Sequence, residues 1–139
     1  MAKMIKFLDT YALIEIYLGN EKFSGYLNEE FIVNDLTLAE YYGILLREYG
    51  ENEAELWLKK LQIYSKKVSI EILIEAVKFR YEHKKQNISF FDAVGYIFSI
   101  KNGYYFVTGD KEFENMKNVE FKKKWLKYYG ISTVAKSNS

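Results

Sequence analysis

The 139-residue chain contains no cysteine and no proline, and its single histidine is His83. Without cysteine, disulfides and thiolate metal sites are excluded. One histidine cannot form a histidine-rich metal site, and it argues against a Ser-His-Asp triad. No apolar run approaches the roughly 18 residues of a membrane helix, and no signal peptide opens the chain. We therefore expect a cytoplasmic protein that does not contact membranes.

The chain also lacks a strong excess of charge of either sign. Its net charge of +1 argues against a broadly basic surface, so any nucleic acid must bind at a local patch. The length fits one domain, and 49% hydrophobic with 28% charged residues is ordinary for a globular protein. A chain of this size buries roughly two-thirds of its unfolded surface, which is enough for a substantial core.

Short apolar segments alternate with helical patterns along the chain. Strands are predicted at 5–8, 31–34, 67–70, 104–107 and 118–121. Helices are predicted at 11–18, 21–28, 36–50, 52–65, 71–86 and 89–101, with Thr37 and Gly50 as caps of the third. In the helix at 71–86, one face is predicted to carry Ile72, Ala76, Val77 and Phe79. The alternation predicts an α/β fold, in which a mostly parallel sheet lies between two layers of helices.

Four acidic residues fall near the junctions between these predicted strands and helices. Asp9 follows the first strand, Glu40 lies one turn into the helix after the second, and Asp110 follows the fourth. Asp92 lies in the first turn of the helix that precedes the fourth strand. Ligand sites in parallel sheets lie outside the carboxyl ends of the strands, so we expect a site at this edge.

Each acid also has a purely structural interpretation. Asp9 and Asp110 are suited to capping the helical turns that follow them, and Glu40 and Asp92 have the spacing of capping boxes. Taken singly, the structural and functional interpretations are about equally favoured. Four carboxylates in one cleft repel each other and raise each other's pKa, and a fold tolerates such a cluster mainly when a cation neutralises it. Oxygen ligands suit Mg²⁺ or Mn²⁺, and such a site is suited to phosphodiester hydrolysis.

The residues around these acids resemble the PIN-domain nucleases, and in particular the small VapC-type toxins of toxin–antitoxin pairs. The matching segments are FLDTYALIEIY, LTLAEYYGIL and ISFFDAVGYIFSIKNGYYFVTGDKEF, at 7–17, 36–45 and 88–113. The last segment is the most specific, because it orders a serine, an aspartate, a helix, a glycine, a strand and Thr-x-Asp. Two adjacent phenylalanines before Asp92 are bulkier than is usual in the family.

The resemblance implies a three-layer α/β/α domain at residues 1–121 and an endoribonuclease that depends on Mg²⁺ or Mn²⁺. It assigns Asp9, Glu40, Asp92 and Asp110 as catalytic, metal-binding acids, with water activated by the metal as the nucleophile. It also implies an RNA substrate, an antitoxin partner and a homodimer.

Three further residues have auxiliary roles by the same resemblance. Thr108 is the hydroxyl of the Thr-x-Asp element, and Glu112 matches a position where some members place an extra acid. For Glu112, a solvent-facing acid in a turn is at least as well supported. Thr10 either orients water or metal or caps the first helix, and we favour capping.

Residues 122–139 form a basic and aromatic extension whose last residues we expect to be disordered. Candidate RNA-binding residues are Lys122, Lys123, Lys124 and Lys127. A terminal amphipathic helix with its aromatic side chains packed on the domain is the favoured alternative.

Three other functions stay open at this point. A stand-alone RNA-processing nuclease would keep the same site without an antitoxin. A non-catalytic RNA- or protein-binding module would be expected to lack some of the four acids. A response-regulator receiver domain expects an acidic pair after the first strand, and Asp9 has no acidic neighbour.

Overall fold

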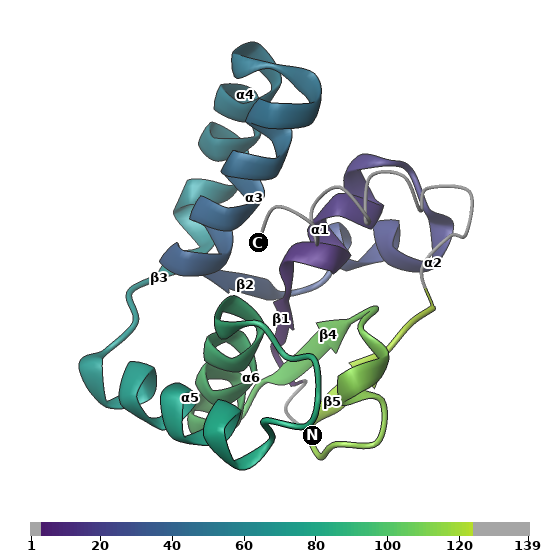
Figure 1. Ribbon diagram of the computed structural model, residues 1–139. Coiled ribbons are helices and arrows are strands. Elements are labelled where there is room, and N and C mark those ends of the chain that lie inside the picture. The colour runs from purple at the N-terminus through teal and green to yellow at the C-terminus, as the bar shows by residue number, and fades with distance from the viewer. Residues whose placement is uncertain (1–3, 124–139) are drawn as a thin grey trace.

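A parallel five-stranded sheet forms the centre of the molecule in the computed structural model, which describes residues 4–123 (Figure 1). The strand order is β3-β2-β1-β4-β5, and every adjacent pair is parallel. The strands are β1 (Lys6–Leu8), β2 (Phe31–Asn34), β3 (Ser65–Lys66), β4 (Tyr105–Thr108) and β5 (Val119–Phe121). The predicted α/β class with a parallel sheet is confirmed.

Helices cover both faces of this sheet. Those of the first face are α1 (Thr10–Tyr17), α2 (Glu21–Ser24), α3 (Asp35–Tyr49) and α4 (Glu51–Leu61). On the second face lie α5 (Ile70–Glu82) and α6 (Phe90–Asn102). Three single-turn 3₁₀ helices complete the described part of the chain: η1 (Gly25–Asn28), η2 (Gln62–Tyr64) and η3 (Lys111–Phe113). Figure 1 shows α3 and α4 as a hairpin on one side and α5 with α6 on the other.

Strand residues alternate between the two cores because successive side chains of a strand point to opposite faces. In β1, Phe7 packs in the core under α5 and α6, and the adjacent Leu8 packs in the core under α1 and α3. The same alternation holds in β4, where Phe106 faces the second core and Val107 the first. The sheet therefore lies between two separate hydrophobic cores, one packed on each of its faces.

Several local predictions are wrong. The helix predicted at 71–86 ends at Glu82, and the one predicted at 21–28 is the short α2 followed by η1. The third strand is Ser65–Lys66 rather than 67–70, and helix α4 ends at Leu61, where a 3₁₀ turn follows. The N-cap of α3 is Asn34 rather than Thr37, because the Asn34 side chain accepts a hydrogen bond from the Thr37 amide at 2.8 Å. The predicted C-cap, Gly50, is confirmed, and its φ of +93° is a conformation that other residues rarely adopt.

The fifth helix has two apolar faces where the sequence predicted one. Ala76 and Phe79 are buried against the second core, with Ile72 partly buried beside them. Val77, which we predicted on the same face, is 53% exposed and lies on the outer side of α5. Val77 follows Ala76 directly, and consecutive helical residues lie about 100° apart, so helix geometry already separates Val77 from the buried face.

Gly95 lets α6 approach the sheet closely. A Cβ built at this position would lie 3.0 Å from ring atoms of both Phe7 and Phe106. Gly95→Ala is therefore expected to lower the free energy of unfolding by about 1–2 kcal/mol, since overpacking outweighs the better helix propensity of alanine. Urea denaturation measures this difference.

Gly43 is the matched control for this substitution. It lies in the interior of α3, and nothing stands within 4 Å of a Cβ built there. Gly43→Ala is expected to stabilise the protein by up to about 1 kcal/mol through helix propensity alone. Equal effects of the two substitutions would contradict the close approach of α6 to the sheet.

Within residues 4–123, no helix is long and apolar enough to cross a membrane.

Candidate active site

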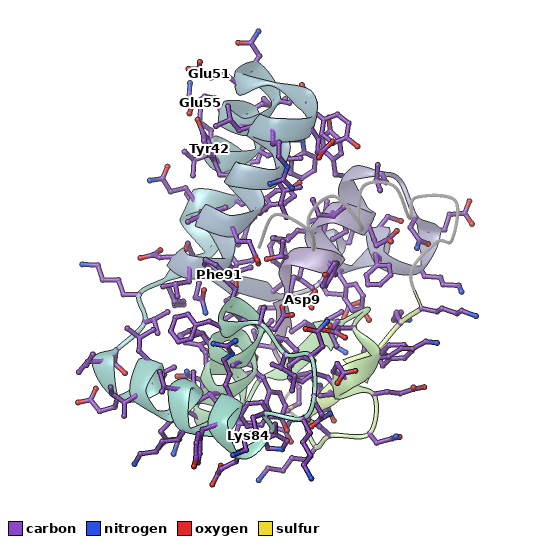
Figure 2. The ribbon with its side chains drawn as sticks, viewed as in Figure 1. Asp9, Tyr42, Glu51, Glu55, Lys84 and Phe91 are labelled. Atoms are coloured by element: carbon purple, nitrogen blue, oxygen red, sulfur yellow. The ribbon has the colours of Figure 1, made fainter. Side chains whose placement is uncertain are left out.

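The four predicted acids come from four segments that meet at the carboxyl edge of the sheet. Asp9 directly follows β1, and its amide donates to the Val107 carbonyl of β4 at 3.1 Å. Glu40 lies on α3, which follows β2, and Asp110 lies two residues after β4. Asp92 lies in the first turn of α6. Because α6 leads into β4 and runs back along it, the first turn of α6 lies at the edge where β4 ends. In Figure 2, Asp9 lies where the starts of α1 and α6 come together.

Two of the acids also cap the turns that follow them. The Asp9 Oδ1 atom accepts from the Ala12 amide at 2.7 Å, and Asp110 Oδ1 accepts from the Glu112 amide at 3.0 Å. The first turn of α6 is capped by Ser89, whose Oγ accepts from the Asp92 amide at 3.1 Å. These bonds confirm the predicted caps at Asp9, Asp110 and Ser89, and they fix where the carboxylates stand without using both oxygens of Asp9 or Asp110. The capping box predicted for Glu40 is wrong, because Asn34 caps α3.

Hydroxyl groups hold two of the acidic segments in place. The Thr10 hydroxyl donates to the Glu40 carboxylate and so joins α1 to α3. Our preference for Thr10 as the cap of α1 is wrong, because Asp9 occupies the N-cap position. The Thr108 hydroxyl accepts from the Asp110 amide at 3.0 Å and fixes the turn after β4.

Burial makes the negative charges of this cluster costly. The exposed fractions of Asp9, Asp92 and Asp110 are 2%, 7% and 8%. Burial raises the pKa of Asp9 to about 7, and repulsion from Asp110 and Glu40 adds to this effect. The Thr108 hydroxyl and the Ala12 amide act in the opposite direction on the Asp9 pKa.

Burial also acts on the pKa values of Asp92 and Glu40. Burial raises the pKa of Asp92 well above its usual value, and repulsion from Asp9, Glu40 and Asp110 raises it further. Burial also raises the pKa of Glu40, while the hydrogen bond from Thr10 lowers it. Asp92 is therefore near enough to Asp9, Glu40 and Asp110 for their charges to act on it.

The cluster has the donor chemistry of a divalent-cation site. The Asp9 Oδ2 atom is buried, and it has no hydrogen-bond partner within the part of the chain that the structure describes. A buried carboxylate oxygen without a donor is strongly disfavoured unless a cation or proton neutralises it. Within residues 4–123, no group of three or more His, Cys, Asp or Glu side chains is arranged so that it could hold a metal ion. Carboxylate oxygens are the kind of ligand that suits Mg²⁺ or Mn²⁺.

Two residues beside the acids were missed by the sequence analysis. Tyr11 is partly buried, and burial together with repulsion from all four carboxylates raises its pKa. Asn34 is fully buried at the end of β2, and its Nδ2 has no hydrogen-bond partner among residues 4–123. The sequence could have pointed to both residues. Tyr11 directly follows Asp9 and Thr10, and Asn34 ends a predicted strand.

The structure gives some of the remaining candidates contacts of other kinds, and two of them lie outside the described residues. The Glu112 Oε1 atom accepts from the Asn87 amide at 3.2 Å and ties η3 to the loop before α6. Lys122 follows β5, and its ammonium lies 5.7 Å from the centre of the Tyr26 ring. Lys123 is exposed. Lys124 and Lys127 lie outside the described residues.

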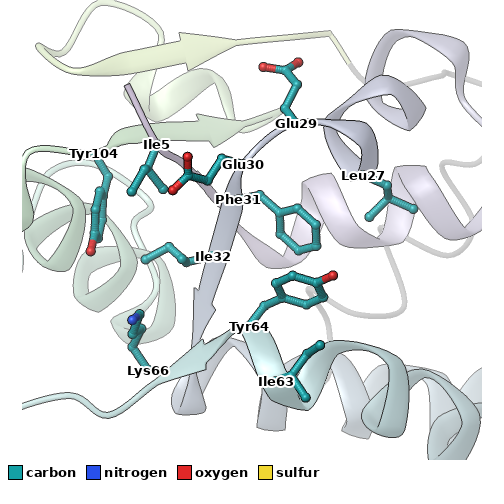
Figure 3. A pocket seen from close by; sticks show the side chains of 10 residues that line it. All are labelled: Ile5, Leu27, Glu29, Glu30, Phe31, Ile32, Ile63, Tyr64, Lys66 and Tyr104. Carbon is teal, nitrogen blue, oxygen red and sulfur yellow. The ribbon is translucent and has the colours of Figure 1, made fainter. Parts of the chain in front are cut away.

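A separate cavity of about 330 Å³ opens near the opposite, amino edge of the sheet (Figure 3). The rings of Phe31 and Tyr64 lie against each other on its wall, with their centres 4.4 Å apart. Its other lining residues come from the starts of β1, β2 and β4 and from the η2–β3 segment: Ile5, Leu27, Glu29, Glu30, Ile32, Ile63, Lys66 and Tyr104. None of the four predicted acids lines this cavity, so the carboxyl edge remains the candidate site.

Solved structures share this fold across most of their length. A chain of a toxin–antitoxin complex from Klebsiella pneumoniae has a TM-score of 0.69 at 18% identity, over 86% of this chain and 99% of that one. VapC20 from Mycobacterium tuberculosis, described as a sarcin–ricin loop cleaving toxin, gives 0.69 at 18% identity, over 81% and 95%. A chain of DNA-bound VapBC from Salmonella typhimurium gives 0.65 at 19% identity, over 86% and 98%.

The sequence itself matches one family over most of its length. No curated protein matches the chain. A family model described as PIN domain matches residues 6–119, which include strands β1 to β4, the first residue of β5 and all four acids. The chain belongs to the PIN-domain family.

Proposed function

We propose that the chain is a metal-dependent endoribonuclease and the toxin of a type II toxin–antitoxin pair. The observation that carries this proposal is the convergence of four carboxylates at one edge of the sheet, three of them buried and that of Glu40 partly buried. One oxygen of Asp9 has no donor in the described chain. Membership of the PIN-domain family and the fold shared with VapC toxins support it.

Asp9, Glu40, Asp92 and Asp110 would hold Mg²⁺ or Mn²⁺. The bound metal would supply water activation and neutralisation of charge on the scissile phosphate. Thr10 holds Glu40 toward α1, and Thr108 holds the backbone that presents Asp110, so both hydroxyls are positioning groups. Tyr11 would keep its proton at neutral pH, because its raised pKa leaves the hydroxyl a hydrogen-bond donor beside the site.

The proposal of a protein partner rests on the solved structures that share this fold and not on a contact observed in this chain. Several of the similar structures are toxin–antitoxin complexes, among them the Klebsiella pneumoniae complex and VapBC from Salmonella typhimurium. We propose an antitoxin protein as the partner that holds the nuclease inactive, and RNA as its substrate.

Metal dependence is tested with the purified protein and total cellular RNA. With Mg²⁺ or Mn²⁺ we expect discrete RNA fragments, and with EDTA we expect cleavage to fall to the level of the untreated RNA, because the buried carboxylates need a cation. Adding the protein encoded next to this chain's own gene is expected to suppress the fragments. Separation of the RNA on a denaturing gel measures all three results.

Fragments that persist in EDTA would contradict the metal requirement and leave a metal-independent nuclease. An RNA pool that stays intact under every metal condition would contradict the general nuclease. Cleavage that no adjacent gene product suppresses would instead favour the stand-alone RNA-processing enzyme.

A further inference from the structure

One aromatic side chain next to the acids belongs to neither hydrophobic core. Phe91 is partly exposed and is a member of neither core, whereas its neighbour Phe90 packs on the second one. Within residues 4–123, no other aromatic ring lies against the ring of Phe91. The described part of the chain therefore gives this ring no partner to stack on.

The geometry of α6 places this ring beside the end of β1. Gly95 follows Phe91 by about one helical turn, so both lie on the same face of α6, and Gly95 approaches the ring of Phe7. The step back from Gly95 to Phe91 covers about 6 Å of helix. Two residues of strand cover about the same distance and lead from Phe7 to Asp9. Because α6 runs opposite to the strands, both steps lead to the carboxyl edge, and Figure 2 shows Phe91 and Asp9 near the start of α6.

We propose that the ring of Phe91 stacks on the RNA base next to the phosphodiester bond that is cut. The inference rests on the proposed nuclease function, which brings the scissile phosphate to the four carboxylates. Phe91 directly precedes Asp92, and their Cα atoms are about 3.8 Å apart across a trans peptide, so a nucleotide bound at the acids has its base within reach of the ring. Aromatic side chains commonly bind RNA bases by stacking. Phe91 is thus a positioning residue that holds the nucleotide and does not touch the reacting atoms.

A purely electrostatic role for the ring predicts different results. An apolar side chain at this position would exclude water from the acids, and burial is the main cause of the raised pKa of Asp92. Leucine also excludes water but has no aromatic face, so Phe91→Leu keeps this role and removes stacking. Tyrosine keeps the aromatic face, so Phe91→Tyr keeps both. The two substitutions therefore separate a ring that stacks from an apolar cover.

Cleavage of a short synthetic RNA tests the proposal. The RNA spans the strongest cut mapped in total cellular RNA, and rates are measured with Mg²⁺ or Mn²⁺. We expect Phe91→Leu to lower kcat/KM at least about fivefold, as loss of one stacked base does, and Phe91→Tyr to stay within about twofold of the unmodified chain. The pH dependence of the rate is expected to be the same in all three proteins.

Tyr81→Leu is the matched control for loss of an aromatic ring. Tyr81 is 70% exposed on α5, and none of the four acids lies on that helix. The control is expected to cleave the synthetic RNA as the unmodified chain does. Circular dichroism of each variant checks that the fold is kept.

RNA that lacks one base tests whether the ring acts through that base. Abasic nucleotides are placed in turn on either side of the cut. At the stacked position, Phe91→Leu is expected to cause no further loss, because the contact is already absent. Binding gives a readout that does not need cleavage. A fluorescent adenine analogue at the same position should be quenched by the Asp92→Asn variant, and quenched less when Phe91→Leu is added.

The outcomes distinguish this inference from the proposed function. Cleavage by Phe91→Leu at the unmodified rate, or a loss that persists with both abasic RNAs, would overturn the stacking role alone. If Phe91→Leu cleaves normally but escapes suppression by the adjacent gene product, the ring binds protein and the proposal is overturned. A chain that cuts no RNA would overturn the proposed function, and this inference with it.

Discussion

Asp92→Asn is expected to lower the rate of RNA cleavage at least about a hundredfold, because replacing outer partners of a metal site already costs about 10- to 100-fold and Asp92 would bind the metal itself. Asparagine has nearly the same shape as aspartate but cannot carry the negative charge that balances a divalent cation. The N-cap of α6 is unaffected, since it uses the Asp92 amide and the Ser89 hydroxyl.

The stability of this variant is expected to change in the opposite direction. Burial and three neighbouring carboxylates raise the pKa of Asp92, so its charge opposes folding at neutral pH. In EDTA, Asp92→Asn should therefore unfold at a denaturant concentration equal to or higher than that of the unmodified protein. Activity measured under single-turnover conditions and urea denaturation of the same preparation separate the two effects.

Glu114→Gln is the matched control for loss of one negative charge near η3. Glu114 is exposed and lies outside the acidic cluster, so cleavage is expected to stay within about twofold of the unmodified rate. If Asp92→Asn cleaves as fast as this control, Asp92 has no part in catalysis and its burial is structural.

The second large effect concerns the pH dependence of stability without metal. The pKa of Asp9 is raised from 3.8 in its ordinary state to about 7 in the folded protein. Between these values the folded state holds more protons than the unfolded state, so stability falls as pH rises from about 4 to about 7 and levels off above that. At about 1.4 kcal/mol per pKa unit, Asp9 contributes on the order of 3–4 kcal/mol to this fall.

Asp9→Asn isolates this contribution. Asparagine keeps the oxygen that accepts from the Ala12 amide, so the cap of α1 is retained while the titration is removed. We expect the free energy of unfolding in EDTA to fall less between pH 5 and about pH 8 in the variant than in the unmodified protein. Adding Mg²⁺ or Mn²⁺ at the higher pH should stabilise the unmodified protein more than the variant. Parallel pH profiles for the two proteins would contradict a raised pKa at Asp9.

Much of the fold could be predicted from local patterns. The strand at 31–34 and the helix at 89–101, with its Ser89 cap, were read within one residue at each end, because hydrophobic periodicity and caps act over a few residues. The weakest element was the third strand. Only Ser65 and Lys66 pair with β2, and neither has the apolar alternation that identifies a strand.

The errors at Thr37, Thr10 and Val77 have different causes. Asn34 at the end of β2 starts α3 earlier than Thr37 would, through a bond between residues three apart. The Thr10 hydroxyl bonds to Glu40, which lies 30 residues away, and only the fold brings the two together. Val77 lies about 100° round the helix from the buried Ala76, which the helical spacing already indicates.

The sequence by itself determined the alternation of strands and helices and the four acids at their junctions, because both depend on residue type and spacing along the chain. Only the tertiary structure decided that these acids share one buried environment, that an oxygen of Asp9 lacks a donor in the described chain, and that α5 has a second apolar face. Burial, mutual repulsion and missing hydrogen bonds depend on which distant segments the fold brings together. Spacing along the chain does not specify them.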